Sequence, residues 1–411
     1  MSAVADQAVD SPARPPKPAA GRLVWLDAIK GLAILGVLAH HFVAPATAFK
    51  LKISTEGFPG GLDLIQSLAH ANSRNPIDFI FLILAGLGYQ GVHVFLVASG
   101  FALAVADAKR PQQVKFRAFL GKIVQRLLYP YWVFVVFLAL IGGVEHVIHM
   151  YPGWLIGSSK QDFIINFFLL RTLKQDWLWV YPGALWFVPL IVQLYLIYPL
   201  LGGAMRKRPT ITLIACLALT LAFRGFAVLF LSAAPIGVNV SGPQTPLTFF
   251  LARLFEFGLG VWFGQYFATH TVRLSRGPLF GLLAAGLAVW GLGIFSICYK
   301  PGLIVCEPLI GLGLSMAMFA IAQGIEELTW VQKPIVFLGT RTYSLFLTHS
   351  MLIPTALSLQ PGQSCMLHFP IYVVAACLLA YVFDLGLEGL KTLWTALRSR
   401  RDTGGPKRES A

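Results

Sequence analysis

Charged residues are scarce in this 411-residue chain, which has 32 Lys and Arg and only 18 Asp and Glu. Together they make up 12% of the sequence, whereas hydrophobic residues make up 56% and the mean hydropathy is +0.70. Soluble domains contain about 25% charged residues. The shortage of charge excludes an ordinary soluble domain and predicts an all-α, polytopic integral membrane protein.

Cysteine is also rare, and the five cysteines form no Cys-x-x-Cys pair and lie near no suitably spaced histidine. This excludes the usual zinc-binding patterns, so no metal site is expected. Cys298 and Cys306 flank one short outer loop, and this spacing permits a disulfide in an oxidising periplasm. Buried free thiols in helices are the commoner arrangement, and we expect them here.

The deficit of acidic residues gives the chain a net charge of +14. Lys and Arg gather in alternate short loops, which is typical of cytoplasmic loops in a membrane protein and attracts anionic lipids. This pattern explains the charge without nucleic acid, which is not expected as a partner. It also predicts that both termini are cytoplasmic, as an even number of spans requires.

Apolar runs of membrane-spanning length recur along the chain, and about ten are predicted to be transmembrane helices. Residues 77–87 are an additional candidate for a short or re-entrant helix. Residues 1–21 are expected to be a disordered cytoplasmic leader, residues 22–390 the transmembrane domain, and residues 391–411 a basic cytoplasmic tail. The ten expected spans are 24–43, 91–107, 128–147, 185–202, 210–232, 249–268, 279–298, 303–323, 335–357 and 368–388.

The first expected span carries ionisable side chains inside an apolar helix, where they are costly and mark functional sites. Lys30 and His41 are eleven residues apart, so they share a helix face and lie roughly 16 Å apart along the axis. This distance approximates the reach from the phosphates of coenzyme A to its thioester sulfur. We predict that Lys30 binds a phosphate and that His41 takes a proton from an attacking hydroxyl group. His40 points about 100° away, so at most one of the two histidines is expected to face the same chamber as Lys30. The geometry selects His41 and leaves His40 to pack against neighbouring residues or to support His41 from behind.

Other interpretations of these residues remain open. Lys30 could extend to the lipid headgroups, and a buried neutral histidine can hydrogen-bond a neighbouring helix. His41 could also carry the acyl group as a nucleophile. A proton-coupled transporter or flippase for an anionic or glycosidic solute would use the same residues as a proton relay and a counter-charge. The absence of a visible internal repeat disfavours that alternative.

Five segments in order resemble the acyltransferase 3 family of integral-membrane O-acyltransferases. Leu26-Asp27-Ala-Ile-Lys30-Gly31 with His41 resembles the family's Leu-Asp-x-x-Arg-Gly followed by a histidine, with Lys30 in place of the arginine. The other four segments are Gly91 to Phe101, with His93 in place of an acid; Lys122 and Arg126 before Tyr129 and Pro130, where the arginine sits one residue earlier than in Arg-x-x-Pro; Trp186 to Pro199; and Leu338 to His349.

The resemblance implies transfer of an acyl group, with acetyl the expected one, to a hydroxyl of a cell-envelope or secreted carbohydrate or glycolipid. The donor is acetyl-CoA or another acyl-CoA, used as a substrate, with no permanently bound cofactor. The location implied is the bacterial inner membrane. Some relatives carry a fused periplasmic domain that completes the transfer. Without one, either the acceptor reaches the membrane site directly or a separate periplasmic transferase takes over.

The same resemblance assigns candidate site residues. His41 and His349 are the catalytic candidates, and Lys30, Lys122 and Arg126 are the candidates for binding the donor phosphates. The acceptor-binding candidates are Trp186, Gln193 and Tyr343. Trp186 and Gln193 are seven residues apart, so we expect them to share a helix face, where they could stack on a sugar and hydrogen-bond it.

Purely structural roles are alternative interpretations for several of these residues. Trp186 could belong to an aromatic belt at the membrane interface, and His349 could make a hydrogen bond between helices. Arg253 and Glu256, three residues apart, are expected to form an internal pair. Arg224 could extend to the headgroups or meet an acidic acceptor.

Overall fold

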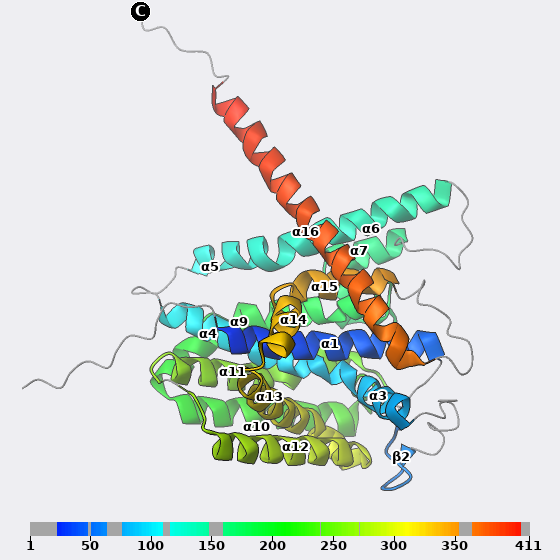
Figure 1. Cartoon of the computed structure of the whole chain (residues 1–411), viewed down its shortest axis with the longest axis vertical. Coiled ribbons are helices and arrows are strands. Elements are labelled where there is room, and N and C mark those ends of the chain that lie inside the picture. The colour runs from blue at the N-terminus through cyan, green and yellow to red at the C-terminus, as the bar shows by residue number, and fades with distance from the viewer. Residues whose placement is uncertain are drawn as a thin grey trace, which may run out of the picture.

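The computed structural model describes residues 23–47, 51–63, 76–109, 116–147, 159–238, 240–270, 272–352 and 364–403. Helices dominate these residues (Figure 1), which confirms the prediction of an all-α protein. Two short strands, β1 (Lys52–Ile53) and β2 (Leu62–Asp63), form an antiparallel pair. The expected leader over residues 1–21 lies outside the described residues.

Eight helical segments within the described ranges are long and apolar enough to cross a membrane, and they coincide with eight of the ten expected spans. Three of them are composite, because a 3-10 turn joins α3 to α4, a π-helix joins α5 to α6, and the 3-10 helix η5 runs into α9. The candidate at 77–87 is therefore a short helix in line with the second span. The helices are α1 (Val24–Thr47), α3 (Pro76–Gly86) with η1 (Gly88–Gln90) and α4 (Gly91–Ala108), α5 (Phe116–Ile123) with η2 (Val124–Leu128) and α6 (Tyr129–Val147), η5 (Gly183–Trp186) with α9 (Phe187–Lys207), α10 (Pro209–Phe230), α12 (Arg276–Ile297), α13 (Cys306–Gly324) and α16 (Cys365–Thr403).

The other two expected spans, 249–268 and 335–357, are made of shorter pieces. In the first, η7 (Phe250–Arg253) precedes α11 (Leu254–Phe267). In the second, the helix is broken at Arg341, whose φ of −108° and ψ of 14° are not helical. The pieces of the second are α14 (Thr329–Thr340), α15 (Thr342–Thr348) and η9 (His349–Leu352).

Short helices connect the spans at the end of the molecule that also carries β1 and β2. They are α7 (Lys160–Phe167), η4 (Leu170–Leu173), α8 (Gln175–Leu178), η6 (Thr245–Thr248) and η8 (Lys300–Ile304). At the other extreme, α16 continues beyond the bundle (Figure 1), so residues 391–403 of the expected tail are helical.

Helix α4 packs backbone against backbone with α11, and α1 does so with α14. A Cβ atom on Gly260 of α11 would lie 2.0 Å from the carbonyl oxygen of Val97 on α4. A Cβ atom on Gly339 of α14 would lie 1.7 Å from the carbonyl oxygen of Asp27 on α1. Small residues permit this close approach between membrane helices.

Replacing Gly260 by alanine should therefore destabilise the protein by about 1–3 kcal/mol, because the added methyl group forces α4 and α11 apart. Thermal unfolding of the purified protein in detergent measures this loss. Gly281→Ala in α12 is the matched control, since nothing lies within 4 Å of its Cβ position. The control should be neutral or stabilise the helix by up to about 1 kcal/mol. Equal losses in both variants would contradict the packing.

Candidate active site

Two pockets lie along α1, one in each half of the helix. The cation pocket has a volume of about 800 Å³ and is lined by Lys30, Lys122, Arg126 and Arg206 among others. The histidine pocket has a volume of about 200 Å³, and His40, His41 and His93 belong to its wall.

The antiparallel course of α1 and α9 separates the two pockets. Lys30, early in α1, and Arg206, near the end of α9, both line the cation pocket. His41, late in α1, and Trp186, at the end of η5 just before α9, both line the histidine pocket. Along α1 the two pockets therefore lie toward opposite ends, whereas along α9 the cation pocket extends from Arg206 back to Phe187, next to Trp186. Because α1 is continuous, Lys30 and His41 are roughly 16 Å apart along its axis.

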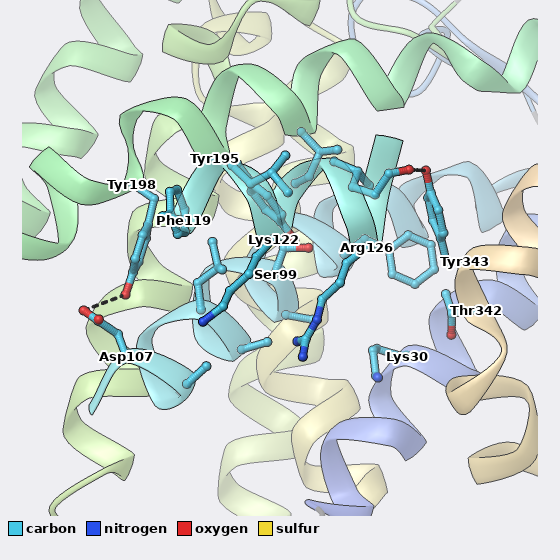
Figure 2. Close-up of a pocket in the computed structure, with 18 of the residues that line it drawn as sticks. Lys30, Ser99, Asp107, Phe119, Lys122, Arg126, Tyr195, Tyr198, Thr342 and Tyr343 are labelled. Carbon is cyan, nitrogen blue, oxygen red and sulfur yellow. Dashed lines mark hydrogen bonds between the residues drawn. The ribbon is translucent and has the colours of Figure 1, made fainter. Parts of the chain in front are cut away.

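The cation pocket gathers positive side chains from three segments, as Figure 2 shows for Lys30, Lys122 and Arg126. Lys30 pairs with Asp27 at 2.6 Å and Arg206 with Asp107 at 2.5 Å. By contrast, the side chains of Lys122 and Arg126 have no ion pair or hydrogen bond with any described residue. Two positive charges in this pocket are therefore left for an anion.

A π-helix shapes the wall that carries Arg126. Residues Val124–Leu128 form η2, and a π turn holds about one residue more than an α turn. That additional residue accounts for the position of Arg126, one residue earlier than the Arg-x-x-Pro spacing. The hydroxyl of Tyr343 donates a hydrogen bond of 2.7 Å to the carbonyl oxygen of Leu127 within this turn. Tyr343 was expected to bind the acceptor, but it lies in the cation pocket. Its hydrogen bond stabilises the π-helix.

His41 and His349 lie side by side, with ring centroids 5.0 Å apart. Nδ1 of His349 is 3.0 Å from the carbonyl oxygen of Leu345 and 2.9 Å from that of Phe346. Carbonyl oxygens only accept, so Nδ1 carries the proton and Nε2 of the neutral ring is the basic nitrogen. This Nε2 is buried and has no hydrogen-bond partner within the described part of the chain. His349 thus presents an unpartnered basic nitrogen on the ring that lies next to His41.

The expectation that His41 alone would share a chamber with Lys30 was wrong, because His40 and His41 both line the histidine pocket and neither lines the cation pocket. The two rings contact each other with centroids 5.3 Å apart, and the pocket wraps around both faces of α1. His40 also hydrogen-bonds the backbone of Ala85 and Gly86 and packs on Tyr89. His41 has no hydrogen bond with the described residues. The two histidines differ in their hydrogen bonds rather than in their helix face.

A buried network of charges forms the far wall of the histidine pocket. Nη2 of Arg253 lies 2.5 Å from Glu307, which also pairs with the fully buried Arg224. Nη1 of Arg253 lies 3.2 Å from Nδ1 of His93 and 3.6 Å from Glu256. The expected pairing of Arg253 with Glu256 is confirmed, and Arg224 meets an acid instead of the headgroups. Sequence reasoning passed over Glu307, although an acid inside an apolar segment is itself a signal of function.

The two residues expected to share a helix face for the acceptor are separated. Trp186 lines the histidine pocket. The amide of Gln193 is occupied: its Nε2 donates to Thr172 Oγ1 at 3.2 Å, and its Oε1 accepts from the N–H of Phe250 at 3.2 Å. Trp186 belongs to a 3-10 helix, so α-helical periodicity does not extend back to it. Gln193 instead fixes the start of η7.

Trp179, which sequence reasoning missed, also lines the histidine pocket. Its ring is about half exposed, and its Nε1 donates to Gln244 Oε1 at 3.0 Å. The buried Arg171 holds the loop that carries Trp179 and Trp186, donating to Asn166 Oδ1 at 2.6 Å and to the carbonyl of Pro182 at 2.8 Å. Burial lowers the pKa of Arg171 to about 10, so it stays protonated at neutral pH. Both tryptophans are thus held on a rigid loop.

No cysteine lines either pocket in the described ranges. Cys298 and Cys306 are free, buried thiols, as expected. No cluster of three His, Cys, Asp or Glu side chains suited to a metal ion occurs among the described residues.

Comparison with known proteins places the chain in a family. A family model for an acyltransferase domain, acyltransferase 3, matches residues 23–385. No curated protein and no solved structure matches the chain. The matched range includes every helix that lines the two pockets.

Proposed function

The chain belongs to the acyltransferase 3 family, and from this premise we propose that it moves an acyl group from acyl-CoA to a carbohydrate hydroxyl. Acetyl is the proposed acyl group, and the acceptor is a cell-envelope or secreted glycan or glycolipid. One observation carries the proposal: α1 joins a pocket with unpaired cations to a pocket with histidines. Their separation along the helix, roughly 16 Å, suits the long arm of coenzyme A.

The donor is proposed to bind with its phosphates in the cation pocket. Lys122 and Arg126 offer charges that no described residue neutralises, and Arg126 can form two parallel hydrogen bonds to a phosphate. Lys30 adds a third positive charge, which it shares with Asp27. Apolar residues such as Phe95 and Phe187 line the same pocket and would contact the pantetheine arm.

His41 is proposed as the general base in the histidine pocket. It takes the proton of the acceptor hydroxyl as the oxygen attacks the thioester carbonyl carbon. The carbon–sulfur bond then breaks, and the departing thiolate recovers the proton from the imidazolium. His349 is a positioning residue, because its Nε2 can accept a hydrogen bond from the other ring nitrogen of His41. This places the basic nitrogen of His41 toward the substrate.

The acceptor is proposed to enter the histidine pocket from the opposite side. Trp179 and Trp186 supply apolar faces for a sugar ring, while Arg253 and Glu307 supply groups that hydrogen-bond its hydroxyls. With this route the acceptor reaches the site directly, and a separate periplasmic transferase is not required for the chemistry.

We propose that the chain crosses the bacterial inner membrane ten times, with both termini in the cytoplasm. The two additional crossings are the shorter segments η7–α11 and α14–α15. The gathering of cations in the cation pocket supports a cytoplasmic position for that pocket.

The proposal is tested by comparing the masses of surface and secreted glycans from cells with and without the gene. We expect a loss of one acyl group per modified sugar in cells without the gene, and the mass difference identifies the acyl group. Identical glycan masses would contradict the proposed acceptor class.

Reversing either free charge of the cation pocket should weaken donor binding. Lys122→Glu and Arg126→Glu should each raise KM for acyl-CoA by at least about tenfold, since tenfold corresponds to only about 1.4 kcal/mol of lost interaction. Lys30→Arg should stay active and Lys30→Glu should raise the same constant. The release of free thiol from acyl-CoA measures these constants.

Lys174→Glu is the matched control, because Lys174 is an exposed cation that lines neither pocket. Its KM should equal that of the wild type. An unchanged KM in both Lys122→Glu and Arg126→Glu would remove these residues from the phosphate site.

A further inference from the structure

We infer that the ring of Phe346 is the seal between the two pockets, and that it must swing aside for a thioester to reach His41. Phe346 lies near the end of α15, with 5% of its surface exposed. Among the described residues it is the one side chain that lines both the cation pocket and the histidine pocket. The two cavities therefore meet at this ring.

On the side of the cation pocket, one aromatic ring contacts Phe346 and a second ring lies beyond the first. Its centroid lies 5.7 Å from that of Phe187, and Phe187 lies 6.4 Å from Phe95. All three rings line the cation pocket. The end of this pocket nearest the histidines is therefore apolar, unlike the end where Lys122 and Arg126 lie.

On the other side, Phe346 adjoins the catalytic candidates. Its centroid lies 6.1 Å from that of His349, and its own carbonyl oxygen accepts the hydrogen bond from Nδ1 of His349 at 2.9 Å. The backbone at Phe346 is thus fixed by the histidine, and the ring itself takes no part in that hydrogen bond. A rotation of the ring would open the passage and leave the hydrogen bond of His349 intact.

This arrangement matters because the two pockets lie toward opposite ends of α1. The inference rests on the proposed function for one point, that each pocket is reached from a different side of the membrane. An apolar constriction between two cavities that each contain charged or ionisable side chains excludes water and small ions. Phe346 then keeps the membrane sealed while no donor is bound.

The test uses the full-length protein reconstituted in vesicles of phosphatidylcholine and phosphatidylglycerol with a pH-sensitive dye inside. After a step in external pH, the rate of internal pH change reports the proton leak, whichever way the protein is inserted. Phe346→Ala should leak severalfold faster than the wild type, and Phe346→Leu should leak at an intermediate rate. Phe319→Ala is the matched control, because Phe319 is a similarly buried phenylalanine that lines neither pocket.

Phe319→Ala should leak no faster than the wild type. The inference is overturned if Phe346→Ala and Phe346→Leu leak no faster than Phe319→Ala. Phe346→Leu removes less volume, so it decides the question if the alanine variant does not fold. The leak needs neither donor nor acceptor, so its outcome is separate from that of the proposed function. If the wild type transfers no acyl group but the Phe346 variants leak, the proposed function is wrong and the role of Phe346 as a seal stands.

Discussion

Replacing His41 by alanine should lower the rate of acyl transfer by about a hundredfold to ten-thousandfold, the usual contribution of a general base. His41 lines the histidine pocket and has no hydrogen bond with the described residues, so its ring is available to a substrate. His40→Ala should retain more activity, because the His40 ring is held by the backbone of Ala85 and Gly86. Thiol release from acyl-CoA by purified, folded protein measures both rates.

The neighbouring His349 provides a second arm of the same experiment. His349→Gln retains a side-chain oxygen that can accept a hydrogen bond from His41, whereas His349→Ala does not. The glutamine variant should therefore keep more activity, and the alanine variant should also shift the pH profile of the rate. Wild-type activity in His41→Ala would remove His41 from the mechanism.

Replacing Glu307 by glutamine should destabilise the protein by about 3–5 kcal/mol, the usual cost of breaking a buried ion pair. Glu307 contacts Arg224 and Arg253, and all three side chains are almost fully buried. The substitution leaves two guanidinium groups with too little negative charge in a medium that cannot solvate them. Chemical unfolding in detergent, followed by tryptophan fluorescence, measures the loss.

Asp176→Asn is the control for this prediction. Asp176 and Lys174 are 2.9 Å apart, but both side chains are more than half exposed. Loss of an exposed pair costs at most about 1 kcal/mol. Similar losses for Glu307→Gln and Asp176→Asn would show that the buried network does not stabilise the fold.

Much of the helical framework could be predicted because lipid imposes a minimum apolar length on each crossing. The alignment of Lys30 and His41 on α1 was equally accessible, since an unbroken α-helix has a fixed rise and rotation per residue. Hydropathy reports burial, however, and not helical continuity. It therefore could not reveal the break at Arg341 or the π-helix at Val124–Leu128.

The walls of the two pockets depend on contacts between residues far apart in the sequence. Glu307 meets Arg224 and Arg253 only after α10, η7 and α13 have packed. Phe346 lines both pockets from α15, which begins after the helix is interrupted at Arg341. No spacing rule within one helix contains this information. The same limit explains why Gln193 was assigned to the acceptor although its amide fixes η7.

We propose above all that a donor in the cation pocket reacts with an acceptor in the histidine pocket. The most direct measurement supplies isotopically labelled acetyl-CoA to the reconstituted protein, together with glycans and glycolipids extracted from cells that lack the gene. Mass spectrometry of the acceptor and titration of free thiol are then read together. We expect label on the glycan in equal amount to the thiol released, and both products formed at least about a hundredfold more slowly with His41→Ala. Unlabelled glycans and no released thiol in the wild type would contradict it.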